Sequence, residues 1–325
     1  MFSFEKTFAS RPVLLAPMED VSDAVFRKLC RELGADVCYT EFVNVDSLMK
    51  GCLKSRKKLT LAKGDQPTAI QIYGADPQTL AEAASVAEAA EPAFIDINAG
   101  CWLPKIVSRG AGAGWLRDPI RMVEMAKLVV ERVGLPVTVK TRIGWGPESE
   151  MPIVDLARRL EDVGVRALTI HCRTALMRHE GPADWSWARK AREAVRIPVV
   201  VNGDVRTAAD CARALDQTGC AAVMVARGAM EHPWVFREAR ALLDRGEILP
   251  GPTVDERLAL LARQMELNVA HRNEKNGVEC VRRHLRGYLR EVPDSELLRE
   301  ALNRSDYLAP SLAIIEEARG ARRAA

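Results

Sequence analysis

The sequence predicts a (β/α)8 TIM barrel followed by a small all-helical C-terminal domain. Eight short apolar runs occupy the first 246 residues, and each ends in a polar cluster that a helical pattern follows. Strands that alternate with helices pair in parallel, because each crossover returns the chain to the same end of the sheet. Eight such units in about 230 residues match this barrel class, which typically takes ~250 residues. Beyond residue 252 no strand candidate occurs, so the rest of the chain is expected to be helical.

The eight expected strands place reactive residues at their C-terminal ends. The strands cover residues 13–18, 37–42, 68–74, 94–100, 137–142, 167–173, 198–204 and 221–228. Active sites of such barrels lie at the C-terminal ends of the strands. The sequence therefore indicates a site built from the segments APMED, TEF, QIYG, NAGC, KTR, HCRT, NGD and ARG.

Proline and glycine mark the ends of the helices between these strands. Pro77 and Pro119 stand at the start of two helices, where the missing N–H would have no helical partner. Gly134, Gly219 and Gly246 are expected just after the end of three others, at the position that favours a left-handed backbone.

The segment LPGP at 249–252 divides the chain into an expected barrel domain, 1–248, and a helical domain, 252–325. Helical patterns in the second domain cover 254–272, 277–290, 296–302 and 309–319. From residue 252 onward the chain has 13 Lys and Arg against 12 Asp and Glu, so this domain is nearly neutral. Arg282, Arg286 and Arg290 are four residues apart and would share one helix face. Such a stripe is either a solvated surface or a contact with nucleic acid.

Composition limits the class of protein without identifying it. The net charge of +3 permits a nucleic-acid partner but does not require one. The eight cysteines show neither a CxxC pair nor a metal-ligand spacing, so we expect a reducing compartment and no metal. No apolar run reaches the ~18 residues that span a membrane, and the N-terminus lacks a secretion signal. We therefore expect a cytoplasmic protein without a membrane segment, and a monomer.

The strand ends suggest a flat cofactor that carries a phosphate. The loops after the seventh and eighth strands commonly hold a phosphate in this fold, and here they carry Asn202-Gly203-Asp204 and Ala226-Arg227-Gly228. Gln71, Lys140 and His171 add donors for an electron-rich ring. Flavin mononucleotide (FMN) fits this set, whereas the absence of a GxGxxG turn argues against a dinucleotide. A sugar phosphate without flavin is the competing ligand.

Cys101 is the candidate proton donor. It follows the fourth strand on a loop that continues into the glycine-rich run 110–114. A thiol with an ordinary pKa near ~8.5 is mostly protonated at pH 7, so it can act as an acid without activation. The glycines would let this loop move when a substrate binds.

In this order the motifs resemble the tRNA-dihydrouridine synthase family, and the resemblance covers nearly the whole chain. The segments that carry it are LLAPMEDVSD at 14–23, TEF at 40–42, QIYGADP at 71–77, DINAGC at 96–101, VKTRIGW at 139–145, LTIHCRT at 168–174, VVVNGDV at 199–205 and VMVARGAMEHPWVFRE at 223–238. Several matched blocks at consistent spacing are far more specific than one motif. The pattern is most similar to the bacterial B-type branch.

The resemblance implies an FMN-dependent barrel that reduces the C5–C6 bond of specific uridines in tRNA with NADPH. Hydride would pass from reduced FMN to C6, and Cys101 would protonate C5. Asn98 and Arg173 would contact the uridine or its phosphate, and the helical domain would bind tRNA through Arg282, Arg283 and Arg286. The residues implied to hold FMN are Pro17, Met18, Glu19, Gln71, Lys140, His171, Asn202, Gly203, Asp204, Ala226 and Arg227.

The chain departs from the family pattern at several positions. Trp102 follows Cys101 where the pattern has proline, and Gly287 replaces an aromatic residue in the tail. Other departures are Asp20, Cys172 and Ala226, each in place of glycine. The Trp102 ring could stack on the flavin or on a base, or could fill the uridine pocket until RNA moves it aside. Two alternatives therefore stay open: a flavin- and RNA-binding homologue with altered chemistry, and a small-molecule flavin oxidoreductase, against which the arginine-bearing tail argues.

Overall fold

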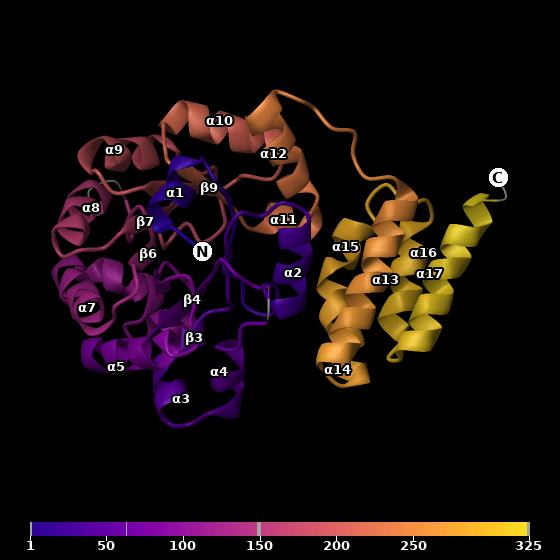
Figure 1. Ribbon diagram of the computed structural model, residues 1–325, viewed down its shortest axis with the longest axis horizontal. Helices are drawn as coiled ribbons and strands as arrows, with labels where there is room; N and C mark the ends of the chain where they lie inside the picture. The colour runs from indigo at the N-terminus through magenta and orange to yellow at the C-terminus, as the bar shows by residue number, and fades with distance from the viewer. Residues whose placement is uncertain (1, 63, 148–150, 324–325) are drawn as a thin grey trace.

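The computed structural model describes residues 2–62, 64–147 and 151–323 and contains the predicted barrel (Figure 1). All strand pairs are parallel, in the order β1-β9-β8-β7-β6-β5-β4-β2. A parallel bridge between Leu14 and Val37 brings β1 and β2 together and closes the ring. The strands are β1 Val13–Leu15, β2 Cys38–Tyr39, β3 Val43–Asn44, β4 Thr68–Tyr73, β5 Ile95–Ala99, β6 Val137–Arg142, β7 Ala167–His171, β8 Val199–Asn202 and β9 Ala222–Val225.

The second expected strand, 37–42, is split into β2 and β3, which both pair with β4. Between them Thr40 turns its hydroxyl oxygen to the backbone N–H of Gln71, 3.2 Å away. This side-chain bond replaces a bond of the regular ladder, so the predicted strand is correct in place but wrong in continuity.

Helices surround the barrel and cover its N-terminal end. The outer ring is α2 Ala24–Glu32, α5 Pro77–Glu88, α7 Pro119–Arg132, α8 Ile153–Asp162, α9 Ser186–Ala194, α10 Ala208–Thr218 and α12 Val235–Arg245. Shorter helices are α1 Phe4–Ala9, α3 Val45–Met49, α4 Leu53–Lys58, α6 Pro104–Val107, the 3-10 helix η1 Gly112–Arg117 and α11 Arg227–Glu231. None of the helices in the described ranges combines the length and hydrophobicity that a membrane crossing needs.

The predicted helix boundaries are confirmed with one exception. Asp76 and Asp118 cap α5 and α7, each followed by a proline at the first helical position. Gly219 and Gly246 end α10 and α12 in the left-handed conformation. Gly134 does not end a helix, since the cap of α7 is Val133 in extended conformation.

The barrel interior changes from apolar to polar along its axis. Near the N-terminal end Leu14, Tyr39 and Phe94 pack with Phe4 and Phe8 of α1, which lies across that end. The upper layer is polar and buried, with Gln71, Asp96, Thr138 and Thr169 in β4 to β7. A buried polar group requires hydrogen-bond partners, so this layer is constrained by its bonds rather than by packing alone.

Helices also form the chain after residue 252, and they lie beside α2 and α11 of the barrel (Figure 1). They are α13 Val254–His271, α14 Glu274–Val281, the 3-10 helix η3 Arg282–His284, α15 Leu285–Tyr288, α16 Ser295–Arg304 and α17 Leu308–Arg323. A separate hydrophobic cluster holds them together and includes Leu261, Met265, Leu285 and Tyr288. Trp234 of the barrel joins this cluster.

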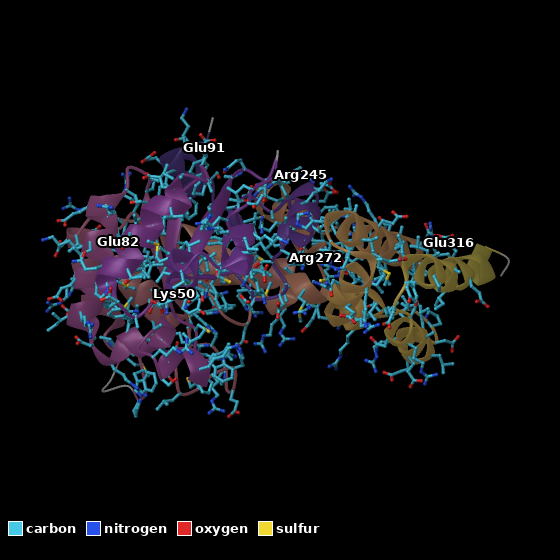
Figure 2. All side chains as sticks on the ribbon, turned by 90° about the horizontal axis from the view of Figure 1, so that it is seen from below. Lys50, Glu82, Glu91, Arg245, Arg272 and Glu316 are labelled. Atoms are coloured by element: carbon cyan, nitrogen blue, oxygen red, sulfur yellow. The ribbon has the colours of Figure 1, made fainter. Side chains whose placement is uncertain are left out.

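The single helix expected over 277–290 is broken at η3, so Arg282, Arg286 and Arg290 do not follow one α-helical face. The break accompanies the packing of buried His284 against Phe26 of α2, with ring centroids 4.6 Å apart. The ion pair between Arg272 and Asp23, 3.0 Å long, lies at the same junction (Figure 2).

Gly287 explains its own departure from the aromatic pattern. A Cβ atom at this position would lie 2.4 Å from the carbonyl oxygen of Glu231, on α11. The backbones of α15 and α11 are therefore in direct contact, and no side chain fits between them.

We expect Gly287→Ala to lower the unfolding free energy by about 1–3 kcal/mol, the usual cost of overpacking a tight contact. Thermal unfolding followed by circular dichroism measures the change. Gly251→Ala is the matched control, because nothing lies within 4 Å of its Cβ position. Equal melting temperatures for the two variants would contradict the proposed contact.

Candidate active site

The C-terminal ends of the strands surround a cavity of about 310 Å³. Residues from six strand ends and their loops meet there, although they are far apart in sequence. All the residues predicted to hold the cofactor line it, together with Asn98 and Cys101: Pro17, Met18, Glu19, Gln71, Lys140, His171, Asn202, Gly203, Asp204, Ala226 and Arg227. Arg173 does not line it, and the tail arginines lie elsewhere.

A chain of hydrogen bonds forms the floor of the cavity. Gln71 Nε2 donates to Asp96 Oδ2 at 2.6 Å, and Thr138 donates to the other carboxyl oxygen. Asn98 Nδ2 donates to Gln71 Oε1 at 3.0 Å. The backbone N–H groups of Gly100 and Cys101 both donate to Asn98 Oδ1, each at 3.0 Å.

The direction of this chain follows from its backbone end. A backbone N–H can only donate, so Asn98 must turn its oxygen to Gly100 and Cys101 and its NH2 group to Gln71. Gln71 must then turn its own NH2 group to Asp96. The orientation of both amides is therefore determined by bonding and does not depend on how nitrogen and oxygen were assigned.

Lys140 and Asp96 are the two charged groups of the floor. Burial raises the pKa of Asp96 to about 7, although bonds from Gln71 and Thr138 and the charge of Lys140 act in the opposite direction. Burial and the charge of Arg142 lower the pKa of Lys140 to about 8, while Asp96 partly offsets them. Within the described ranges the Lys140 ammonium group has no hydrogen bond or ion pair, so its charge is available to an anionic ligand.

Cys101 presents a protonated thiol to this cavity. Its backbone is held on both sides, since its N–H bonds to Asn98 and its carbonyl oxygen accepts from Ala113 at 2.9 Å. Burial raises the pKa of the thiol, whereas the backbone N–H of Leu103 and the charge of Arg142 lower it. The net shift is upward, so the thiol carries its proton at pH 7 and has stabilising groups beside it.

Arg173 lies behind the cavity wall, where it contacts His171 and Asp204. Its side chain is 3% exposed, and one Nη donates to Asp204 at 2.6 Å. The other Nη lies 3.3 Å from His171 Nε2. Because arginine only donates, His171 Nε2 accepts and the ring is neutral with its hydrogen on Nδ1. Burial and the nearby charges of Arg142 and Lys140 also lower the pKa of His171 well below its ordinary value.

Two glycines let the loops after β8 and β9 pack closely. Gly203 has a φ of +115°, and a Cβ there would lie 3.0 Å from the His171 ring. A Cβ on Gly228 would lie 2.7 Å from the Cα of Arg206. Arg227, at the start of α11, lies 3.5 Å from Asp204, so its charge is only partly neutralised. This end of the cavity is positively charged and bounded by backbone.

Arg142, His179 and Trp102 were not predicted as binding or catalytic residues but belong to the site. Arg142 is 2% exposed and donates to the carbonyl oxygens of Gly100, Thr174 and Arg178 at 2.8–2.9 Å. It thereby joins the loops after β5 and β7. Its position in the KTR segment at a strand end was the only available signal. His179 lies eight residues beyond β7, where no local pattern identifies it.

The remaining predicted residues have partners within the protein. Glu19 accepts from Lys58 Nζ at 2.6 Å, which also lies 3.7 Å from Glu41. Glu19, Asp20 and Glu41 form an acidic group of the kind that can hold a cation, but Lys58 already pairs with two of them. All eight cysteines are free.

The tail arginines differ in their surroundings. Arg282 pairs with Asp306 at 2.6 Å and donates to the carbonyl oxygen of Ser305, so it connects α14 to the loop before α17. Arg283 is exposed and lies 3.7 Å from Asp20 of the barrel. Arg286 is exposed and has no ion pair with any residue that the structure describes.

Comparison with known proteins agrees with the resemblance in the motifs. The chain matches the dihydrouridine synthase family over residues 14–319. It is 36% identical to tRNA-dihydrouridine synthase B of Pseudomonas aeruginosa over 90% of this chain and 88% of that protein. It is 35% identical to the B enzyme of Xanthomonas axonopodis pv. citri, over 94% and 92% of the two chains. A probable tRNA-dihydrouridine synthase of Rickettsia conorii is 34% identical over 90% and 89%. The chain therefore belongs to the dihydrouridine synthase family of oxidoreductases.

Proposed function

We propose that this protein reduces the C5–C6 bond of uridines in tRNA to 5,6-dihydrouridine, with FMN as cofactor and NADPH as reductant. The observation that carries the proposal is the meeting, in one cavity, of a protonated thiol with donors suited to an anionic cofactor. The names of the relatives support tRNA as the substrate, since two of them are tRNA-dihydrouridine synthases B.

The residues of the cavity fit FMN. Lys140 offers an ammonium group without an ion pair among the described residues, and an anionic ligand would compensate its partial burial. Gln71 and His171 offer neutral donors on the same floor. Arg206 and Arg227 line the end where the loops after β8 and β9 meet, and charge-assisted bonds from such residues suit a phosphate. We assign the flavin ring to the first group and the phosphate to the second.

Bound FMN, once reduced by NADPH, supplies the hydride for C6 of the uridine. The protein supplies the proton and the orientation. Cys101 keeps its proton because its thiol is buried, and gives it to C5. The resulting thiolate is stabilised by the Leu103 N–H and by the charges of Arg142 and Lys140. Asn98 uses one N–H on Gln71, which leaves a second N–H to donate to a pyrimidine oxygen.

Arg173 acts in this scheme as a positioning residue rather than through contact with the uridine. Its bonds to His171 and Asp204 hold the imidazole neutral and keep Nδ1–H as the donor. The RNA contacts of the helical region, 252–325, are assigned to Arg283 and Arg286, since both are exposed. Arg282 contributes by holding that region together through Asp306.

Replacing the acid tests the reaction directly. We expect Cys101→Ala to lower dihydrouridine formation at least ~100-fold, as loss of a general acid does. Flavin content and the rate of flavin reduction by NADPH should stay unchanged. Dihydrouridine is measured by mass spectrometry of tRNA taken from a strain that lacks the enzyme. Buried Cys211→Ala is the control, and equal activity of Cys101→Ala and wild type would refute the acid assignment.

Lys140 makes flavin binding depend on pH. Its pKa of about 8 means that the ammonium charge is lost as pH rises through this value. We therefore expect FMN affinity to fall between pH 7 and pH 9, and Lys140→Met to weaken binding on the order of tenfold at pH 7. Fluorescence quenching of FMN measures the dissociation constant. An equally steep pH dependence in Lys140→Met would exclude Lys140 as its source.

The tail arginines are tested by charge reversal. We expect Arg283→Glu with Arg286→Glu to weaken tRNA binding and to reduce the dependence of affinity on salt by about two charges. Flavin content should not change. Arg304→Glu, on the exposed face of α16, is the control. Unaltered affinity in the double variant would show that this surface does not contact the RNA.

A further inference from the structure

Trp102, Arg178 and His179 form a cluster at the cavity mouth, which we term the rim cluster. Trp102 follows Cys101 after β5, and the other two lie on the loop after β7. Trp102 Nε1 donates to His179 Nε2 at 3.1 Å, and the two rings meet edge to face with centroids 5.5 Å apart. Both rings line the cavity. The cluster therefore joins two loops over the end of β6.

The bond from Trp102 determines the state of His179. An indole N–H only donates, so His179 Nε2 accepts and the ring hydrogen is on Nδ1. Burial and the charges of Arg142 and Arg227 lower the pKa of His179 to about 4, which agrees with a neutral ring at pH 7. Nδ1–H has no acceptor among the residues that the structure describes. It is a neutral donor beside the cavity.

Arg178 adds a positive charge to the rim cluster. Its guanidinium carbon lies 5.2 Å from the centre of the Trp102 ring. Its backbone has a φ of +53°, which is unusual for a residue with a side chain, and its carbonyl oxygen accepts from Arg142 at 2.8 Å. The side chain is exposed, and no acidic group of the described chain pairs with it. Its charge is therefore available to a ligand.

From this arrangement we infer that the rim cluster binds the reacting nucleotide of the RNA and selects it. His179 donates Nδ1–H to an oxygen of the base or ribose, and Arg178 binds the phosphate. Trp102 is a positioning residue that holds His179 in the donating form. The ring of His179 lies 6.2 Å from that of His171, so the contact is next to the reaction site. This inference rests on the proposed function, because it takes RNA as the substrate.

The test measures the affinity of the flavin-loaded protein for an unmodified tRNA transcript. We expect His179→Ala to weaken binding about fivefold, the effect of one lost hydrogen bond. Trp102→Phe keeps a ring but removes the N–H, and should weaken binding about two- to threefold. The double variant should bind no more weakly than His179→Ala, because Trp102 acts through His179. Arg178→Ala should weaken binding and lower the salt dependence by about one charge.

Matched controls are Trp187→Phe on α9 and Arg158→Ala on α8, which make the same chemical changes on the outer ring. Both should bind RNA like wild type. Unchanged affinity in His179→Ala, or additive losses in the double variant, would overturn the inference.

Dihydrouridine formation by the wild-type protein is measured in the same samples and tests the proposed function separately. If the wild type forms none while His179→Ala still weakens RNA binding, the reaction is refuted and the rim contact stands. Flavin absorbance of each variant confirms that the barrel has folded.

Discussion

The backbone N–H groups of Gly100 and Cys101 impose the constraint on which the rest of the site depends. Because they only donate, they orient Asn98, and through it Gln71 and Asp96. Each of these residues is buried inside the barrel, where an unbonded polar group is costly. The same bonds that stabilise the polar layer therefore hold the loop of Cys101 and decide which atoms face the cavity.

The opposite wall follows the same rule with charged groups. Asp204 lies in a left-handed turn and accepts from Arg173, and Arg173 in turn donates to His171. Burial alone would raise the pKa of Asp204, but these bonds lower it below its ordinary value. Most charges of the wall are thus neutralised inside the protein. The charge of Lys140 is not, which makes the floor of the cavity selective for an anion.

The Trp102 departure did not produce either of the two arrangements considered from the sequence. The indole N–H is bonded to His179, and Arg178 lies over the ring. Proline would restrict the backbone and lack a donor. Here the loop is held without it, by Asn98 on the N–H side of Cys101 and by Ala113 on the carbonyl side. The change thus alters the rim of the cavity and leaves the position of the thiol to other bonds.

The sequence by itself determined the barrel, its helix boundaries and the residues that line the cavity, because strand and helix periods are local and strand ends meet at one edge. Lys140 and Cys101 could be located in this way. Only the tertiary structure decided the partners of the long side chains. Arg173, Arg142 and Arg282 can each reach several acceptors, and the choice depends on loops far away in sequence. The break at η3 was equally non-local, because it follows from packing against α2 and α11 rather than from helix propensity.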